Sequence, residues 1–376
     1  RGSLAVTQLL EEAADTAAAG TAPILFVGDE TVVADGALGS WAAPCDAAWA
    51  DEVVASLGAG ERAIGALSFA PGGPAIMHRV AGSGRPPTPV ARDAERRHVV
   101  TPSPTREQYA GGVRDALARI AAGRLEKVVL GRCLDVVSEP PLRADEVVGR
   151  LIATRPGRYV FSVPLTADAG GGPVLVGASP ELLVRRRGAE VSCLPLAGSV
   201  PRSPDPTEDL RRADALLAST KDLEEHAFVV DQIVAALRPV SLALEADPAP
   251  RLLATDTLWH LASSITATVA PGGPSALHLA RLLHPTPAVG GVPTDAALAA
   301  IEEIEGPGLR GPLAGAVGWV DGAGDGEFAV AIRAGVLHGN HLRLFAGAGI
   351  VAGSDPDAEV RETSAKLTTM AKAVGL

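Results

Sequence analysis

An α+β fold with large antiparallel sheets is the fold class predicted by this sequence of 376 residues. Many short β-branched runs are separated by short turns, which join antiparallel strands because a parallel pair needs a long crossover. Long helical patterns lie between these groups of strands rather than alternating with single strands. Both observations favour large antiparallel sheets interleaved with long helices.

The first hundred residues are rich in Ala, Gly and Pro. Apolar runs at 23–27 and 63–67 predict short strands separated by turns. The first long helix is expected over 105–122, where Tyr109, Val113 and other apolar residues fall at helical spacing.

The strand signal strengthens after residue 125. Gly188 lies between two strand patterns and predicts a hairpin. The strands expected in this region are 127–130, 158–165, 173–178, 182–186, 190–196, 316–320, 327–336 and 342–345.

Composition excludes several classes of function. The net charge of −11 argues against nucleic-acid binding, which requires a basic surface. No apolar run approaches the ~18 residues of a membrane span. The three cysteines, Cys45, Cys133 and Cys193, have no CxxC spacing, so we expect neither a disulfide framework nor a zinc site. This cysteine usage fits a cytoplasmic protein.

The chain has only four lysines among its 33 basic residues. One of them, Lys127, begins an apolar strand. It is either a strand-end lysine in water or a desolvated amine with a pKa lowered towards neutrality, which could act as a base.

Glu181 follows a strand and comes directly after Pro180. Such a residue is commonly a solvated turn carboxylate. In an apolar cleft, however, it would keep its proton near neutral pH and could act as an acid.

A single long helix is expected over 207–237, and its apolar stripe is Leu223, Ala227, Val230, Val234 and Leu237. Glu225 lies roughly opposite this stripe, so periodicity alone makes it solvent-facing.

The last helix begins with Asp355 as its cap and ends at Gly375. Glu362 and Lys366 lie four residues apart on it and could form a surface pair. Alternatively, Glu362 and a carboxylate from a second helix could bind Mg²⁺, which prefers oxygen ligands.

The strand before this helix ends in alternating glycines, Gly347 and Gly349. They do not complete a phosphate-binding motif, and their exposed backbone N–H groups are better suited to a carboxylate. Arg333 could supply a bidentate partner for that group. The sequence at 284–287, His-Pro-Thr-Pro, predicts a stiff turn or simply the end of a helix.

In this order and spacing, several segments resemble the chorismate-utilising enzymes, which include isochorismate, salicylate, anthranilate and aminodeoxychorismate synthases. The matching segments are 127–130, 179–183, 196–199, 221–226, 257–261, 284–291 and 345–366. The resemblance covers about residues 105–376 as the chorismate-binding region, and residues 1–104 form a more weakly matching N-terminal part.

The resemblance implies one large domain of two antiparallel sheets packed as a sandwich, with helices outside. It implies that Glu225 and Glu362 bind Mg²⁺, which anchors the ring carboxylate of chorismate. Lys127 would activate water for attack at C2, and Glu181 would protonate the departing C4 hydroxyl. The remaining residues implied to bind substrate are Ser199, His260, Ala288, Val289, Arg333, Gly347, Gly349 and Lys366.

Within the family, relatives that add ammonia generally lack a lysine at the position of Lys127, and they usually depend on a glutamine amidotransferase. The chain has this lysine and no room for an amidotransferase domain, and its turn at 284–291 is similar to that of isochorismate synthases. The resemblance therefore implies an isochorismate synthase, expected as a monomer and in siderophore biosynthesis through 2,3-dihydroxybenzoate, with salicylate and menaquinone pathways left open. A salicylate synthase, or the synthase component of an ammonia-dependent enzyme, remains the alternative.

Overall fold

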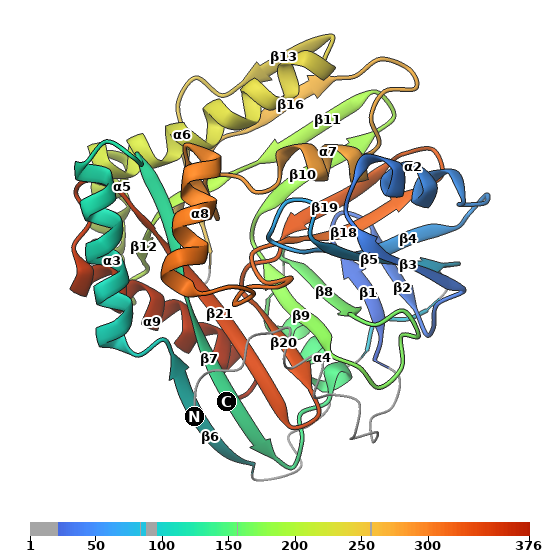
Figure 1. Cartoon of the computed structure of the whole chain (residues 1–376), viewed down its shortest axis with the longest axis horizontal. Coiled ribbons are helices and arrows are strands. Elements are labelled where there is room, and N and C mark those ends of the chain that lie inside the picture. Colours follow the sequence, from blue (N-terminus) through green and yellow to red (C-terminus); the bar gives the residue numbers. More distant parts are fainter. Residues whose placement is uncertain (1–21, 83, 88–95, 156, 256–257) are drawn as a thin grey trace.

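The computed structural model describes residues 22–82, 84–87, 96–155, 157–255 and 258–376. In this part of the chain, two nine-stranded antiparallel sheets and one three-stranded sheet form the framework (Figure 1). Phe161 of the first large sheet and Phe328 of the second belong to one buried hydrophobic core. These sheets confirm the predicted α+β class.

The first large sheet carries one wall of the cleft described below. Two short strands, β17 and β6, pair with different parts of one edge of the long strand β7. Across the sheet the strands are β17 (Gly291–Val292), β7 (Lys127–Glu139), β21 (His341–Ile350), β20 (Ala334–His338), β9 (Val174–Ser179), β8 (Tyr159–Pro164), β1 (Ile24–Val27) and β2 (Thr31–Ala34), with β6 (Arg97–Ser103) on β7.

The second large sheet contains the predicted hairpin around Gly188, formed by β10 and β11. Its strands are, in order, β13 (Ala243–Ala246), β16 (Ile265–Thr268), β11 (Glu190–Leu194), β10 (Leu182–Arg187), β19 (Gly326–Val330), β18 (Ala316–Asp321), β4 (Arg62–Leu67), β5 (Pro74–Val80) and β3 (Gly39–Pro44). The small sheet consists of β12 (Leu196–Pro201), β15 (Leu258–Ala262) and β14 (Arg251–Ala254).

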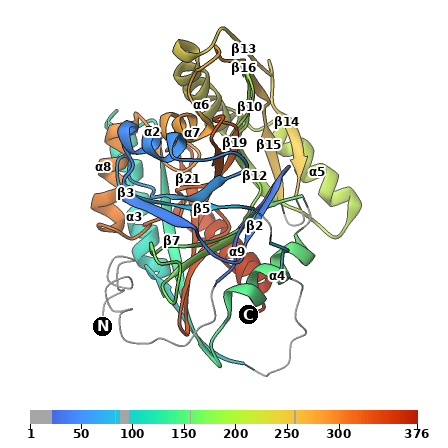
Figure 2. The same cartoon turned by 90° about the vertical axis from the view of Figure 1, so that its right-hand side faces the viewer.

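Helices cover the outside of these sheets, as Figures 1 and 2 show. The last helix, α9, packs against β21, and α8 packs against β7, whereas α5 lies against the small sheet. The helices are α2 (Ala47–Ala55), α3 (Arg106–Ala121), α4 (Ala144–Thr154), α5 (Pro206–Leu217), α6 (Thr220–Leu237), α7 (Ala276–Leu283), α8 (Thr294–Glu305) and α9 (Pro356–Ala373). No helix within the described ranges is long and apolar enough to cross a membrane.

The prediction of one continuous helix over 207–237 is wrong, because the structure contains two helices there. The helix is interrupted at Ala218 and Ser219. The Ser219 side chain caps α6 by accepting a hydrogen bond from the Asp222 N–H. A serine before an acidic first turn is a helix-start signal, and the apolar periodicity concealed it.

The predicted inward stripe of α6 is also wrong by one position over most of its length, although Leu237 is buried as predicted. The buried residues are His226, Val229, Ile233 and Leu237. The buried His226 has a hydrogen-bond partner, since its Nε2 lies 2.8 Å from the Ser263 hydroxyl. Hydrophobic periodicity cannot detect such a polar contact. This rotation turns Glu225 away from bulk solvent, and only 13% of its side chain is exposed.

The strand predicted over 327–336 is likewise divided. Residues 326–330 belong to the second large sheet and residues 334–338 to the first. At Arg333 the backbone has a φ of +53°, an uncommon conformation for a residue other than glycine. The chain therefore crosses between the sheets at this arginine, which places Arg333 where the two sheets diverge.

Candidate active site

One cleft brings together all of the predicted site residues except Lys127. It lies between the small sheet, the end of β21, the turn after α7 and the helices α6 and α9. The predicted residues that line it are Glu181, Ser199, Glu225, His260, Ala288, Val289, Arg333, Gly347, Gly349, Glu362 and Lys366. Residue 257, part of one matching segment, lies outside the described residues.

Lys127 lies directly behind the wall of this cleft. Its side chain is 0% exposed, which excludes the interpretation as a strand-end lysine in water. Its Nζ lies 2.9 Å from Glu225 Oε1, so a carboxylate that lines the cleft is paired with this buried amine.

Glu181 is buried between β9 and β10. Its backbone N–H donates a hydrogen bond to the Ser179 hydroxyl at 3.2 Å, which fixes the turn after Pro180. Burial raises the pKa of Glu181 to about 8, although the Leu196 N–H and the charge of Lys127 oppose the shift. The carboxyl group therefore keeps its proton at pH 7 and can donate it.

Glu362 and Lys366 form the predicted pair on α9, but the pair faces the cleft. The Lys366 Nζ donates to Glu362 Oε1 at 2.6 Å and to the Gly347 carbonyl at 2.9 Å. Burial favours the neutral form of Glu362, but the charges of Lys366, Lys221 and Arg333 outweigh it, so its pKa is lowered. Glu362 is thus an anion at neutral pH.

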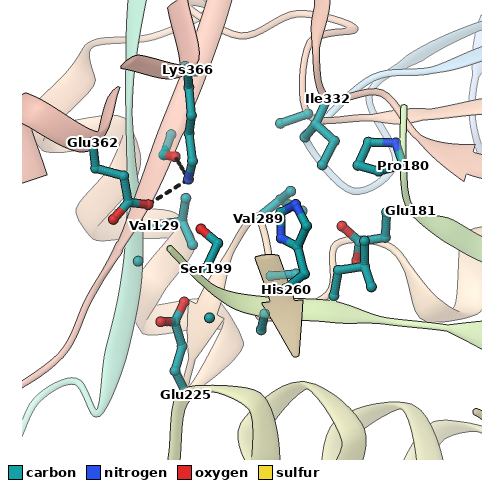
Figure 3. Close-up of a pocket in the computed structure, with 18 of the residues that line it drawn as sticks. Val129, Pro180, Glu181, Ser199, Glu225, His260, Val289, Ile332, Glu362 and Lys366 are labelled. Atoms are coloured by element: carbon teal, nitrogen blue, oxygen red, sulfur yellow. Dashed lines mark hydrogen bonds and ion pairs between the residues drawn. The ribbon is translucent and has the colours of Figure 1, made fainter. Parts of the chain in front are cut away.

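The carboxylates of Glu225 and Glu362 project from two different helices into the same end of the cleft, whereas Glu181 lies at the other end (Figure 3). Two carboxylates suit Mg²⁺, which completes its octahedral shell with water and substrate oxygens. Within the described ranges, no three His, Cys, Asp or Glu side chains form a metal-binding group by themselves. Any metal here would share its coordination with water or substrate.

Gly349 leaves room for this arrangement. A Cβ atom at position 349 would lie 2.2 Å from Glu225 Oε1 and 3.2 Å from the Lys127 Cε. The missing side chain therefore allows the carboxylate and the buried amine to approach the end of β21. At Gly347 a Cβ atom would meet Val129 at 3.0 Å, a milder contact.

Arg333 supplies positive charge to the cleft. Burial lowers its pKa to about 10, with Arg158 and Arg155 acting in the same direction and Glu362 opposing them. The guanidinium is still charged at neutral pH, and it can bind a carboxylate in bidentate fashion.

His260 and Ser199 lie on paired positions of β15 and β12, between the two ends of the cleft (Figure 3). The His260 Nε2 is buried and has no hydrogen-bond partner among the described residues. Burial and the charges of Arg333, Lys366 and Arg158 hold its pKa well below its usual value, so the imidazole is neutral. The imidazole can form a hydrogen bond with a ligand without adding charge to the cleft.

Sequence reasoning missed several residues of the cleft. Lys221 and Asp222 line it beside Glu225, and Lys221 forms an ion pair with Glu359 at 3.3 Å. Lys221 and Asp222 belong to a matching segment, and the scarcity of lysine was an available signal for Lys221. The apolar wall formed by Val129, Ile332 and Phe345 gave no such signal, because these side chains look like ordinary core residues.

Comparison with known proteins agrees with this geometry. The family model described as "Chorismate binding enzyme" matches residues 82–375. The chain belongs to this family of chorismate-binding enzymes.

Three relatives narrow the comparison. The chain is 50% identical to the isochorismate synthase DhbC of Bacillus subtilis over 279 residues, which are 74% of this chain and 70% of the relative. It is 45% identical to the isochorismate synthase EntC of Escherichia coli K12 over 273 residues, 73% of this chain and 68% of that protein. The crystal structure of a Bacillus anthracis protein, assigned as the 2,3-dihydroxybenzoate-specific isochorismate synthase DhbC, superposes with a TM-score of 0.86 at 38% identity. It covers 98% of this chain and 99% of the other.

Proposed function

We propose that this chain is an isochorismate synthase that converts chorismate to isochorismate. The proposal is carried by the arrangement of acidic groups in one cleft. A protonated Glu181 lies at one end, and the anionic Glu362 lies beside Glu225 at the other. An isomerisation that removes one hydroxyl and adds another needs an acid at the leaving group and a fixed anchor for the ring. The similarity to isochorismate synthases supports the same assignment.

Glu225 and Glu362 would hold Mg²⁺, whose positive charge would anchor the ring carboxylate of chorismate. Lys366 would assist beside the same carboxylate. The Arg333 guanidinium, with the backbone at Gly347 and Gly349, would bind the enolpyruvyl carboxylate.

The remaining lining residues would orient the ring between these anchors. Ser199 and His260 present polar groups from the small sheet, and Ala288 and Val289 present an apolar surface from the turn after α7. Two separated cationic anchors fix the orientation of a dianion, which brings the reacting carbon to a defined place.

The chemical step requires Lys127 in its neutral form. A water oxygen then forms a bond to C2 while its proton passes to the Lys127 amine. The double bonds shift and the bond from C4 to its hydroxyl breaks. Glu181 donates its proton to the departing oxygen, which leaves as water. Lys127 is then protonated and Glu181 ionised, and the return of one proton through solvent restores the enzyme.

We further propose that isochorismate formed by this protein enters the route to 2,3-dihydroxybenzoate and siderophores in the cytoplasm. The B. anthracis structure with a TM-score of 0.86 is assigned to that route. On this proposal the protein acts as a monomer with water as its nucleophile and needs no amidotransferase partner.

The test is chromatography of purified protein incubated with chorismate, once with Mg²⁺ and once with EDTA. A Mg²⁺-dependent mixture of chorismate and isochorismate without pyruvate is expected. Salicylate with pyruvate would instead identify a salicylate synthase. The absence of turnover with water, together with turnover of ammonia, would identify the synthase component of an ammonia-dependent enzyme.

A further inference from the structure

A buried ion pair lies immediately behind the apolar wall of the cleft. Glu305 ends α8, and Arg310 follows in the next loop; both side chains are only 3% exposed. The Arg310 Nε donates to Glu305 Oε2 at 2.8 Å and its Nη2 donates to Oε1 at 2.5 Å. This bidentate geometry fixes the plane of the guanidinium.

The same guanidinium joins two backbone segments that line the cleft. Its Nη1 donates to the Val289 carbonyl and its Nη2 to the Val129 carbonyl, each at 2.7 Å. The partner carboxylate accepts the Gly131 N–H at 2.7 Å. One ion pair therefore holds β7 at two points and the turn after α7 at a third.

Aromatic rings enclose this ion pair. The Arg310 guanidinium lies 4.1 Å from the ring centroid of Phe69 and 5.3 Å from that of Phe345, which also lines the cleft. In such a dry environment a carbonyl without its donor carries the full cost of desolvation. Loss of the guanidinium would leave the two carbonyls without this donor. The turn would then be held to β7 only by backbone bonds such as that from the Val129 N–H to the Gly290 carbonyl.

The two segments that Arg310 joins lie next to Lys127, the proposed base. Val129 lies two residues after Lys127 on β7, and Val289 belongs to the turn that continues into β17, where Val292 pairs with Lys127. We propose that Arg310, held by Glu305, is a positioning residue that sets the distance between β7 and the turn at 284–291. It thereby fixes the place of Lys127 relative to the bound ring. This inference rests on the proposed function for the identity of the reaction.

The test compares Arg310→Met with Arg343→Met in the full-length protein. Arg343 is an apt control because it is equally buried, forms a bidentate ion pair with Asp135 on the neighbouring strand β7, and lies outside the cleft. Since a displacement of about 1 Å can cost about 100-fold in rate, kcat should fall about 100-fold in Arg310→Met. KM should change little, because the anchors at Arg333 and Glu362 stay in place, and Arg343→Met should keep the wild-type kcat.

Two milder variants keep the test decisive if Arg310→Met does not fold. Arg310→Lys retains the charge opposite Glu305 but cannot hold both carbonyls in a planar fork, and Glu305→Gln retains the guanidinium but loosens it. Both should lower kcat while KM stays near its wild-type value. The proposal is wrong if both variants keep the wild-type kcat. It is also wrong if kcat falls by the same factor in Arg310→Met and Arg343→Met, because Arg310 is then a structural residue only.

Amide hydrogen exchange separates this inference from the proposed function. Loss of the ion pair should accelerate exchange in 286–292 and at the start of β7 in Arg310→Met, but not in Arg343→Met. This result is expected whatever product the wild-type enzyme makes. A wild-type enzyme without isochorismate formation would overturn the function alone, whereas unchanged exchange would overturn the positioning role alone.

Discussion

Lys127 and Glu181 are the two buried ionisable groups to which the proposed chemistry assigns proton transfer. Each is almost fully excluded from solvent, yet their environments differ. Lys127 has a carboxylate 2.9 Å away, whereas burial disfavours the charge of Glu181 more than the Leu196 N–H and Lys127 favour it. One chain thus provides an amine and a protonated acid within reach of the same cleft.

Replacing Lys127 tests its role as the base. Lys127→Met should lower kcat by about 10³-fold, because positioned proton transfer contributes about 10²–10⁴-fold. Binding of Mg²⁺, measured by calorimetry, should persist because Glu225 and Glu362 remain. Full activity in this variant would remove Lys127 from the mechanism.

Glu181 predicts an alkaline limit to activity. Its folded pKa of about 8 means that the protonated acid is lost as the pH rises through that value. The ratio kcat/KM should therefore fall above about pH 8, and Glu181→Gln should be inactive across the whole range. A rate that stays level to pH 10 would contradict the assignment.

The same group predicts a pH dependence of stability. A carboxyl whose folded pKa is raised binds a proton that the unfolded chain releases, so stability falls with rising pH between the ordinary value of 4.5 and about 8. Relative to Glu181→Gln, the wild-type free energy of unfolding should fall by about 1.4 kcal/mol per pH unit within this window. Urea unfolding of both proteins at pH 5, 7 and 9 measures the difference, and parallel pH profiles would contradict it.

At the scale of single elements, the end of β21 depends on the absence of side chains. Gly349→Ala would place a Cβ atom 2.2 Å from Glu225 Oε1, so the carboxylate must move. The Mg²⁺ concentration for half-maximal activity should rise about tenfold or more, as for other changes in the surroundings of metal ligands. Gly353→Ala is the matched control, because nothing lies within 4 Å of its added Cβ atom, and it should behave as wild type.

The carboxylates that α6 and α9 place at the same end of the cleft predict a second effect, on the binding of the metal. Glu362→Gln keeps the size of the side chain and removes the anion, so Mg²⁺ affinity and turnover should fall together. A magnesium titration of activity checks this. If the titration matched that of the wild type, Glu362 would not be a metal ligand.

The elements themselves were largely predictable, and the exceptions have local physical causes. The hairpin around Gly188 and the cap of α9 at Asp355 follow from local turn and capping chemistry. The break before α6 has a capping signal at Ser219, but continued apolar periodicity concealed it, and periodicity likewise continues through the crossing at Arg333. In α6 a buried polar contact of His226 rotated the helix, and that rotation decides where Glu225 points.

At the scale of the whole molecule, the cleft is an outcome of topology. Its lining residues come from the first large sheet, the small sheet, the helices α6 and α9 and the connecting turns, and they span more than two hundred positions along the chain. Local patterns cannot bring Glu225 on α6 and Glu362 on α9 together. The resemblance of ordered motifs predicted many residues of the cleft, but it missed others such as Lys221 and Asp222 and the ion pair of Glu305 and Arg310 behind its wall.

The central claim is that solvent water supplies the new hydroxyl at C2, and one isotope measurement tests it directly. Chorismate is incubated with the enzyme and Mg²⁺ in water enriched in ¹⁸O, and the isochorismate is analysed by mass spectrometry. We predict one ¹⁸O atom in each isochorismate molecule, located at the C2 hydroxyl. Unlabelled isochorismate would mean that the original hydroxyl migrates within the molecule, and this would contradict the roles given to Lys127 and Glu181.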